Sequence, residues 1–95
     1  MHAQDYFIYG EIKDSLNGSP IISAEIYNIE GQLLSNSDQL GYFKFYTANS
    51  TLDIIVFTEA HNIYKDRIIF ASYDGKIFYS KNIDEIKKKN LILNK

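Results

Sequence analysis

The sequence opens with a stretch in which apolar and polar positions alternate. In residues 7–13 the odd positions are aromatic or charged, and the even positions hold Ile8, Gly10 and Ile12. A period of two is typical of a half-buried strand, so this stretch is predicted to be a strand whose even positions point inward. The next segment, DSLNGSP at 14–20, combines the only proline with other turn-forming residues and predicts a loop.

Alternation returns after this loop. Ala24 and Ile26 share the inward side of a second predicted strand. In residues 42–47, Phe43 and Phe45 alternate with polar or tyrosine positions, so both phenylalanines are predicted to lie in the core. Residues 52–58 are apolar on both sides, which predicts a central strand.

The remaining pattern predicts shorter elements. Further strands are expected at 32–35, 63–71, 76–79 and 91–93, and the Asp-Gly pair at 74–75 predicts a hairpin between the 63–71 and 76–79 strands. One short helix is expected at 82–90, because Asn82 can cap it, acidic residues occupy its first turn and lysines occupy its last. The predicted fold class is all-β, a β-sandwich of seven or eight strands with at most one short helix near the C-terminus.

Composition agrees with one small domain. The chain has 95 residues, no cysteine and 45% hydrophobic residues, so a core without disulfides must stabilise it. Its formal net charge of −2 gives no electrostatic reason to expect nucleic acid or an anionic membrane as a partner. No apolar run approaches the roughly 20 residues that a transmembrane helix needs.

The first four residues are predicted to be a disordered tail. They contain HAQ, which resembles the small and polar residues that remain after a signal peptide is cleaved, and no intact signal peptide precedes the first strand. We therefore expect residues 1–4 to be a cleavage remnant and residues 5–95 to form a single domain of an exported protein.

Candidate chemistry is sparse. Of the two histidines, His2 lies in the expected tail, and His61 lies in a predicted solvated loop two positions from Glu59. This pair is too few ligands for a metal site. The acidic residues are scattered over turns and outward positions, and the 14–18 segment lacks the acid that would close a calcium loop. The sequence therefore predicts no catalytic, cofactor-binding or metal-binding residue, no cofactor and no enzymatic activity.

Tyrosines on the outward sides of strands are the remaining candidates. We expect Tyr9, Tyr27, Tyr42 and Tyr46 to be exposed, and such rings can stack on sugars or contact a protein. The simpler interpretation is that tyrosine favours strands and its hydroxyl tolerates water. These four residues form the only candidate interaction face.

Two segments resemble one known family. Residues 10–27 have the order Gly-x-Ile-x-Asp, a polar loop, Gly-x-Pro-Ile and then x-x-Ala-x-Ile-Tyr, and residues 37–45, SDQLGYFKF, are similar to a Thr-Asp-x-x-Gly-x-Phe-x-Phe block. Both resemble carboxypeptidase-regulatory-like domains, and together they cover residues 8–56. After Phe57 the chain departs from that family, because VFTEAHNIY replaces the Ser-Tyr-x-Gly-Tyr block of many members.

This resemblance implies a transthyretin-like (prealbumin-like) Greek-key sandwich. In Bacteroidetes such domains commonly precede the plug and barrel of TonB-dependent outer-membrane receptors, on the periplasmic side. The resemblance therefore implies a non-enzymatic accessory domain for nutrient uptake, whose partner is the receptor's plug or barrel or a periplasmic protein. The alternative is a carbohydrate-binding or enzyme-accessory module, because related domains are also attached to metallocarboxypeptidases.

Overall fold

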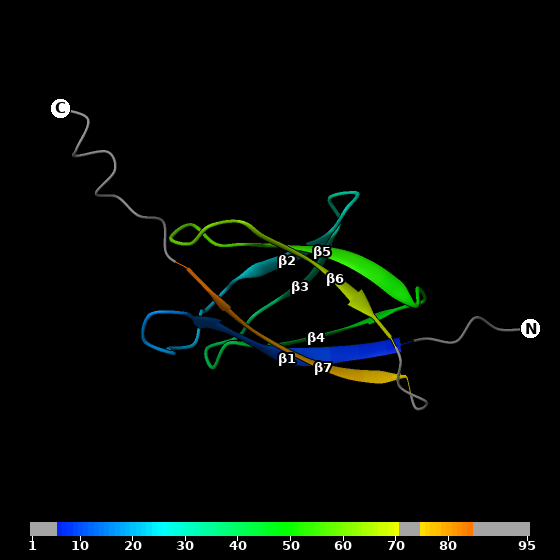
Figure 1. Cartoon of the computed structure of the whole chain (residues 1–95), viewed down its shortest axis with the longest axis horizontal. Coiled ribbons are helices and arrows are strands. Elements are labelled where there is room, and N and C mark those ends of the chain that lie inside the picture. The colour runs from blue at the N-terminus through cyan, green and yellow to red at the C-terminus, as the bar shows by residue number, and fades with distance from the viewer. Residues whose placement is uncertain (1–5, 71–74, 85–95) are drawn as a thin grey trace, which may run out of the picture.

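The computed structural model describes residues 6–70 and 75–84, and in these residues all regular structure is β. These residues form seven strands, and Figure 1 shows that the strands lie in two layers. The described residues contain no helix that could cross a membrane. In chain order the strands are β1 (Tyr6–Asp14), β2 (Glu25–Asn28), β3 (Leu33–Asn36), β4 (Tyr42–Thr47), β5 (Thr51–Phe57), β6 (Tyr64–Ile69) and β7 (Lys76–Ile83).

The strands form two sheets. The three-stranded sheet has the order β4-β1-β7, in which β1 is antiparallel to β4 and parallel to β7. The four-stranded sheet has the order β3-β2-β5-β6, and its neighbours are all antiparallel. The predicted all-β sandwich is confirmed at this level, and β5 lies inside its sheet as expected.

The core lies between the two sheets. Ile8 and Ile12 are fully buried, as the alternation of the first strand predicts. Phe43 and Phe45, which are 4% and 7% exposed, confirm the prediction for β4. The four-stranded sheet contributes Ile26, Leu52, Ile54, Val56 and Ile68 to the core, and Ile21, Phe70 and Ile83 join them from outside that sheet.

Gly10 allows β1 and β7 to lie close together. A Cβ atom on Gly10 would come within 1.6 Å of the carbonyl oxygen of Tyr79, and no side chain could fit there. The glycine at position 10, between the buried Ile8 and Ile12, therefore has a packing reason.

The predicted hairpin between the sixth and seventh strands is wrong. β6 pairs with β5, whereas β7 pairs with β1 in the other sheet, so the connection crosses from one sheet to the other. Gly75 has the positive φ of 73° that a turn there requires, but Asp74 lies outside the described residues. The alternating pattern of a strand does not determine which strand it pairs with. Here β7 pairs along its whole length with the side of β1 that does not face β4.

The predicted helix is wrong at its start. Asn82 and Ile83 belong to β7, and Ile83 is only 2% exposed because it enters the core. Burial of this side chain outweighs the capping signal of Asn82. Asp84 follows β7 without helical structure, and residues 85–90 of the expected helix, the expected strand at 91–93 and the expected tail at 1–4 lie outside the described residues.

Candidate functional site

The outer surface of the three-stranded sheet is unusually aromatic. Five rings lie there, and we call this set the aromatic face: Phe7, Tyr9, Tyr42, Tyr46 and Phe78. Tyr46 and Phe78 are 70% and 55% exposed, and Tyr42 and Tyr9 are 48% and 39% exposed. All five occupy positions that alternate with buried residues of β1 and β4 or with half-buried residues of β7, so the twofold period of a strand places them on one side.

Strand register brings these rings into contact. Phe7 lies opposite Tyr46 on β4, and their ring centroids are 4.8 Å apart. Tyr9 lies opposite Phe78 on β7, with centroids 5.4 Å apart in an edge-to-face arrangement. Phe7 and Tyr9 stack at 5.4 Å along β1 and link the two pairs. Four rings therefore form a continuous strip across all three strands.

Charged residues border this strip. Lys44 lies opposite Tyr9 and between the two tyrosines of β4, and no ion pair within the described residues involves it. Glu11 lies 3.3 Å from the ammonium of Lys13 and also accepts the hydroxyl of Ser80 at 3.2 Å. A shallow groove of about 810 Å³ runs beside these residues, and its lining includes Phe7, Tyr9, Tyr42, Lys44 and Phe78.

Tyr27 is separate from the other predicted tyrosines. It lies on β2 in the four-stranded sheet, whereas Tyr9, Tyr42 and Tyr46 lie together on the aromatic face. Its hydroxyl donates to Oε1 of Glu25 at 2.7 Å, and this bond raises the pKa of the Tyr27 phenol. The structure therefore gives Tyr27 a local partner on its own strand.

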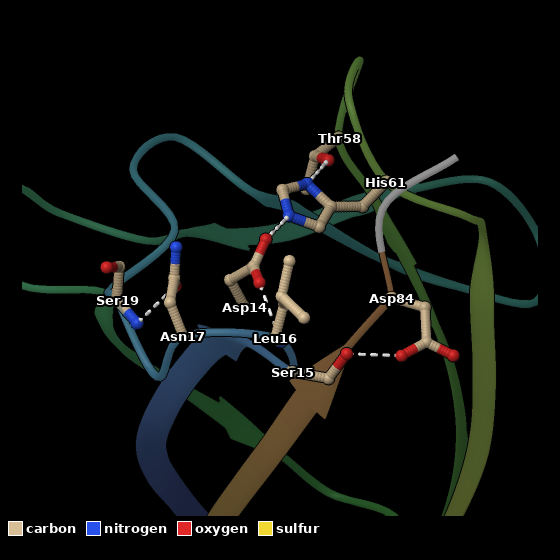
Figure 2. Close-up of polar contacts among 8 residues, drawn as sticks. All are labelled: Asp14, Ser15, Leu16, Asn17, Ser19, Thr58, His61 and Asp84. Carbon is tan, nitrogen blue, oxygen red and sulfur yellow. Dashed lines mark hydrogen bonds and ion pairs between the residues drawn. The ribbon is translucent and has the colours of Figure 1, made fainter. Parts of the chain in front are cut away.

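A polar cluster occupies one end of the sandwich, and Figure 2 shows its residues. Asp14 ends β1, and its Oδ2 lies 2.8 Å from Nε2 of His61, in the turn after β5. Nδ1 of His61 lies 2.8 Å from Oγ1 of Thr58. His61 is 9% exposed and Asp14 is 6% exposed. The expectations of a solvated loop around His61 and of solvated acids are therefore wrong at this pair.

Backbone contacts extend the cluster around the carboxylate. The amide of Leu16 donates to Oδ1 of Asp14 at 2.8 Å, so both carboxylate oxygens have donors (Figure 2). The hydrogen bond from His61, followed by that from Leu16, lowers the pKa of Asp14. The hydroxyl of Ser15 donates to the carboxylate of Asp84, just beyond β7. The cluster thus joins the ends of strands from both sheets.

The cluster superficially has the order of a nucleophile, a base and an acid. Thr58 and His61, however, are three residues apart in one turn, and the side chains of Asp14 and His61 are satisfied by each other, by Thr58 and by the amide of Leu16. No group of three metal-ligating side chains gathers within residues 6–70 and 75–84. The geometry supports a structural role, in which the cluster holds together the loops at this end of the sandwich.

Comparison with known proteins adds information about the fold. No protein-family model matches the chain, and no curated protein matches it. Among solved structures, it is similar to the C-terminal domain of the Caf1A usher, with a TM-score of 0.60 and 8% sequence identity over 85% of this chain and 99% of that domain. In that usher domain, conserved hydrophobic clusters on the surface are important for F1 antigen assembly.

Two members of the aromatic face were not among the predicted site residues. Phe7 could have been found, because it shares the outward side of its strand with Tyr9. Phe78 could not, because its place beside Tyr9 depends on the pairing of β7 with β1. Asp14 and His61 could not be paired from the sequence either, since 47 positions separate them.

Proposed function

We propose that this chain is a non-enzymatic interaction domain of a cell-envelope protein and that it contacts a protein partner through the aromatic face. The continuous strip of rings on the three-stranded sheet carries the proposal, because Tyr9, Tyr46 and Phe78 are exposed and the half-buried Phe7 links them. Large aromatic side chains are enriched among the residues that dominate binding energy at protein interfaces.

The physical state of the rings supports a binding role. Each buries about 150–250 Å² when covered, which supplies a large hydrophobic contribution at an interface. Contacts among Phe7, Tyr9, Tyr46 and Phe78 already restrict their rotation, so binding would cost less side-chain entropy than it would for isolated rings. A partner would meet a largely preformed surface.

Two likenesses support the cell-envelope setting. The usher domain of similar fold uses hydrophobic surface clusters in an assembly process, and the motifs at 10–27 and 37–45 resemble carboxypeptidase-regulatory-like domains. We propose further that the chain is a transthyretin-like Greek-key sandwich at the N-terminus of a TonB-dependent outer-membrane receptor, on the periplasmic side. Its partner is then the plug or barrel of that receptor or another periplasmic protein.

The first test is made in the parent protein. The coding sequence beyond Lys95 should encode a plug and a barrel, and in-frame deletion of residues 5–94 should leave the remainder inserted while it reduces uptake. The double substitution Tyr46→Ser and Phe78→Ser should reproduce that loss with the domain still folded. Ile69→Ser on the other sheet, which is 64% exposed, is the matched control. Normal uptake by the double variant would contradict the proposed role of the aromatic face.

A carbohydrate-binding module is the second candidate. The groove beside the aromatic face has tyrosine rings that can stack on sugars and an exposed amide, Asn36, in its lining. Titration calorimetry of the isolated chain with soluble glycans separates the two candidates. Saturable glycan binding that Tyr42→Ala abolishes would favour the module and contradict the protein-contact proposal.

A further inference from the structure

Lys44 has rings of the aromatic face on three sides. It lies on β4, two positions from Tyr42 and from Tyr46, and directly opposite Tyr9 on β1. Residues opposite each other in an antiparallel pair have Cβ atoms about 4.5–5.5 Å apart, so these side chains are neighbours on the sheet. The side chain of Lys44 is exposed. A cationic group therefore lies among exposed tyrosines.

The ammonium of Lys44 has no counter-charge in the part of the chain that the structure describes. No ion pair within residues 6–70 and 75–84 involves it. The two acidic residues that share the groove with Lys44 are engaged elsewhere. Glu11 lies 3.3 Å from the ammonium of Lys13, and Oδ1 of Asp38 accepts two backbone amides of its own turn, both at 2.9 Å.

The surroundings of Lys44 belong to described strands. β1 lies on one side of β4, and on the other side the hydroxyl of Ser35 on β3 donates to the carbonyl of Lys44 at 2.9 Å. Lys44 also contributes to the lining of the groove of about 810 Å³, together with Tyr9, Tyr42 and Asn36. The side chain is therefore held between two known neighbours and is accessible from the groove.

A protein that covers the strip of rings also covers Lys44, because Tyr9 and Tyr46, its direct neighbours, belong to that strip. An ammonium that loses its water without gaining a counter-charge destabilises a complex. The rings around it exclude water, so an opposite charge placed there interacts more strongly than it would in solvent. The partner therefore needs an acidic group at this position.

We propose that the partner of the aromatic face places the carboxylate of an aspartate or glutamate, flanked by apolar side chains, against Lys44. This inference rests on the proposed function, because it specifies the chemistry of the surface that the partner presents. The apolar flanks cover the rings, and the carboxylate sets the register of the contact. A second copy of this chain would offer Lys44 only carboxylates that already have donors, so the expected occupant is another protein or another part of the receptor.

The first test changes the charge at position 44 in the parent protein. Lys44→Glu should lower uptake by about tenfold or more, because it brings two carboxylates together, and Lys44→Arg should keep normal uptake. Lys65→Glu is the matched control, because Lys65 is exposed on β6 in the other sheet and has no ion pair within the described residues. It should leave uptake unchanged. Normal uptake by Lys44→Glu would overturn the proposal.

Binding in solution separates the charge of Lys44 from the packing of its stem. The isolated chain is titrated with the solubilised remainder of the parent protein, from which residues 5–94 have been deleted. Glutamine and glutamate are similar in size, so they differ chiefly in charge. Lys44→Gln should bind about tenfold more weakly than the unaltered chain, and Lys44→Glu about tenfold more weakly again. Equal losses for both variants would mean that the stem makes the contact, and they would overturn the proposal.

Second-site suppressors decide the matter if the partner is a separate periplasmic protein rather than the remainder. Changes that restore uptake to Lys44→Glu should replace an aspartate or glutamate outside this domain by lysine or arginine. Suppressors found only within the domain would contradict a contact with a partner carboxylate. Sedimentation of the isolated chain gives a further check, because a dimer that Lys44→Glu dissociates would make a second copy the occupant and would overturn the proposal.

Failure of this inference is distinguishable from failure of the proposed function. Normal uptake by Lys44→Glu together with a loss of uptake in the Tyr46→Ser and Phe78→Ser variant would reject only the charge contact. Normal uptake in both variants would reject the role of the aromatic face itself.

Discussion

Asp14 and His61 form a buried hydrogen bond of 2.8 Å between the end of β1 and the turn that follows β5. Because these strands belong to different sheets, the bond links the two layers at one end of the sandwich. Thr58 and Leu16 complete the set of partners around the pair. The pair is therefore expected to affect stability and its dependence on pH.

The first prediction concerns acid. Hydrogen bonds lower the pKa of Asp14 in the folded state below its ordinary value of 3.8. A carboxyl with a lowered folded-state pKa stabilises the fold fully above its unfolded-state pKa, and this stabilisation is lost as pH falls through the folded-state pKa. Acid unfolding followed by circular dichroism should therefore show that Asp14→Asn flattens the loss of stability below about pH 4.

Other carboxyls contribute to the same acid response. The pKa of Asp53 is lowered by its bond to Arg67, and that of Asp66 is also lowered. The informative quantity is consequently the difference between wild type and Asp14→Asn at each pH. If this difference in stability stayed constant from neutral pH down to about pH 2, the hydrogen bond with His61 would not be stabilising the ionised form of Asp14.

The second prediction separates His61 from its neighbour Glu59. His61→Ala leaves the Asp14 carboxylate at a buried site with one donor fewer, and it should lower the free energy of unfolding clearly. Glu59→Ala should have little effect, because the Glu59 side chain is exposed. Urea denaturation compares the two, and equal midpoints would argue against a structural role for the histidine.

The double substitution of His61 and Glu59 by alanine gives a functional control. If the chain is a non-enzymatic domain, this variant should support uptake at temperatures where it remains folded. Loss of uptake by the folded variant would direct attention to the end of the sandwich rather than to the aromatic face.

The third prediction concerns β4. Phe43→Ala should destabilise the domain by about 3–5 kcal/mol, because it removes buried surface and leaves a cavity. Tyr42→Ala on the opposite side of the same strand should cost much less, since that ring is 48% exposed. Chemical denaturation of the two variants should preserve this order, and the reverse order would be incompatible with the observed facing of β4.

The fourth prediction concerns Gly10. A methyl group there would collide with the carbonyl of Tyr79, so Gly10→Ala should disrupt the pairing of β1 with β7 and destabilise the fold severely. Gly18→Ala is the comparison, because that site is open and only its φ of +73° opposes a side chain, at a cost of about 1 kcal/mol. Similar melting temperatures for the two variants would show that β7 can move away from β1.

The pattern of neighbouring residues was sufficient to predict which side chains of a strand point inward. The twofold period of β1 and β4 identified Ile8, Ile12, Phe43 and Phe45 as inward residues, and all four are buried. Turn-forming residues also located the loop that follows β1, where Gly18 has a positive φ, although Asp14 at the start of the predicted loop belongs to the strand. Such features depend on neighbours within a few residues, so the sequence contains the information directly.

Relationships between distant segments could not be predicted in this way. The partner of β7 depends on which sheet edge is open, and the Asp-Gly signal before it carries no information on that choice. The same limit hid the contact of Asp14 with His61 and the presence of Phe78 in the aromatic face. Asn82 is a residue type that favours the start of a helix, but here it lies in a strand, in which the next residue, Ile83, is buried.

The parallel pairing of β1 with β7 has a consequence for synthesis on the ribosome. β1 emerges early, but its neighbour on one side is the last strand of the described chain, so the three-stranded sheet cannot be completed until residue 83 has left the exit tunnel. Pairing over such a sequence distance is slow compared with local hairpins. A nascent chain that ends before Lys76 therefore presents one side of β1 without its strand partner, at the stage when a chaperone would bind it most readily.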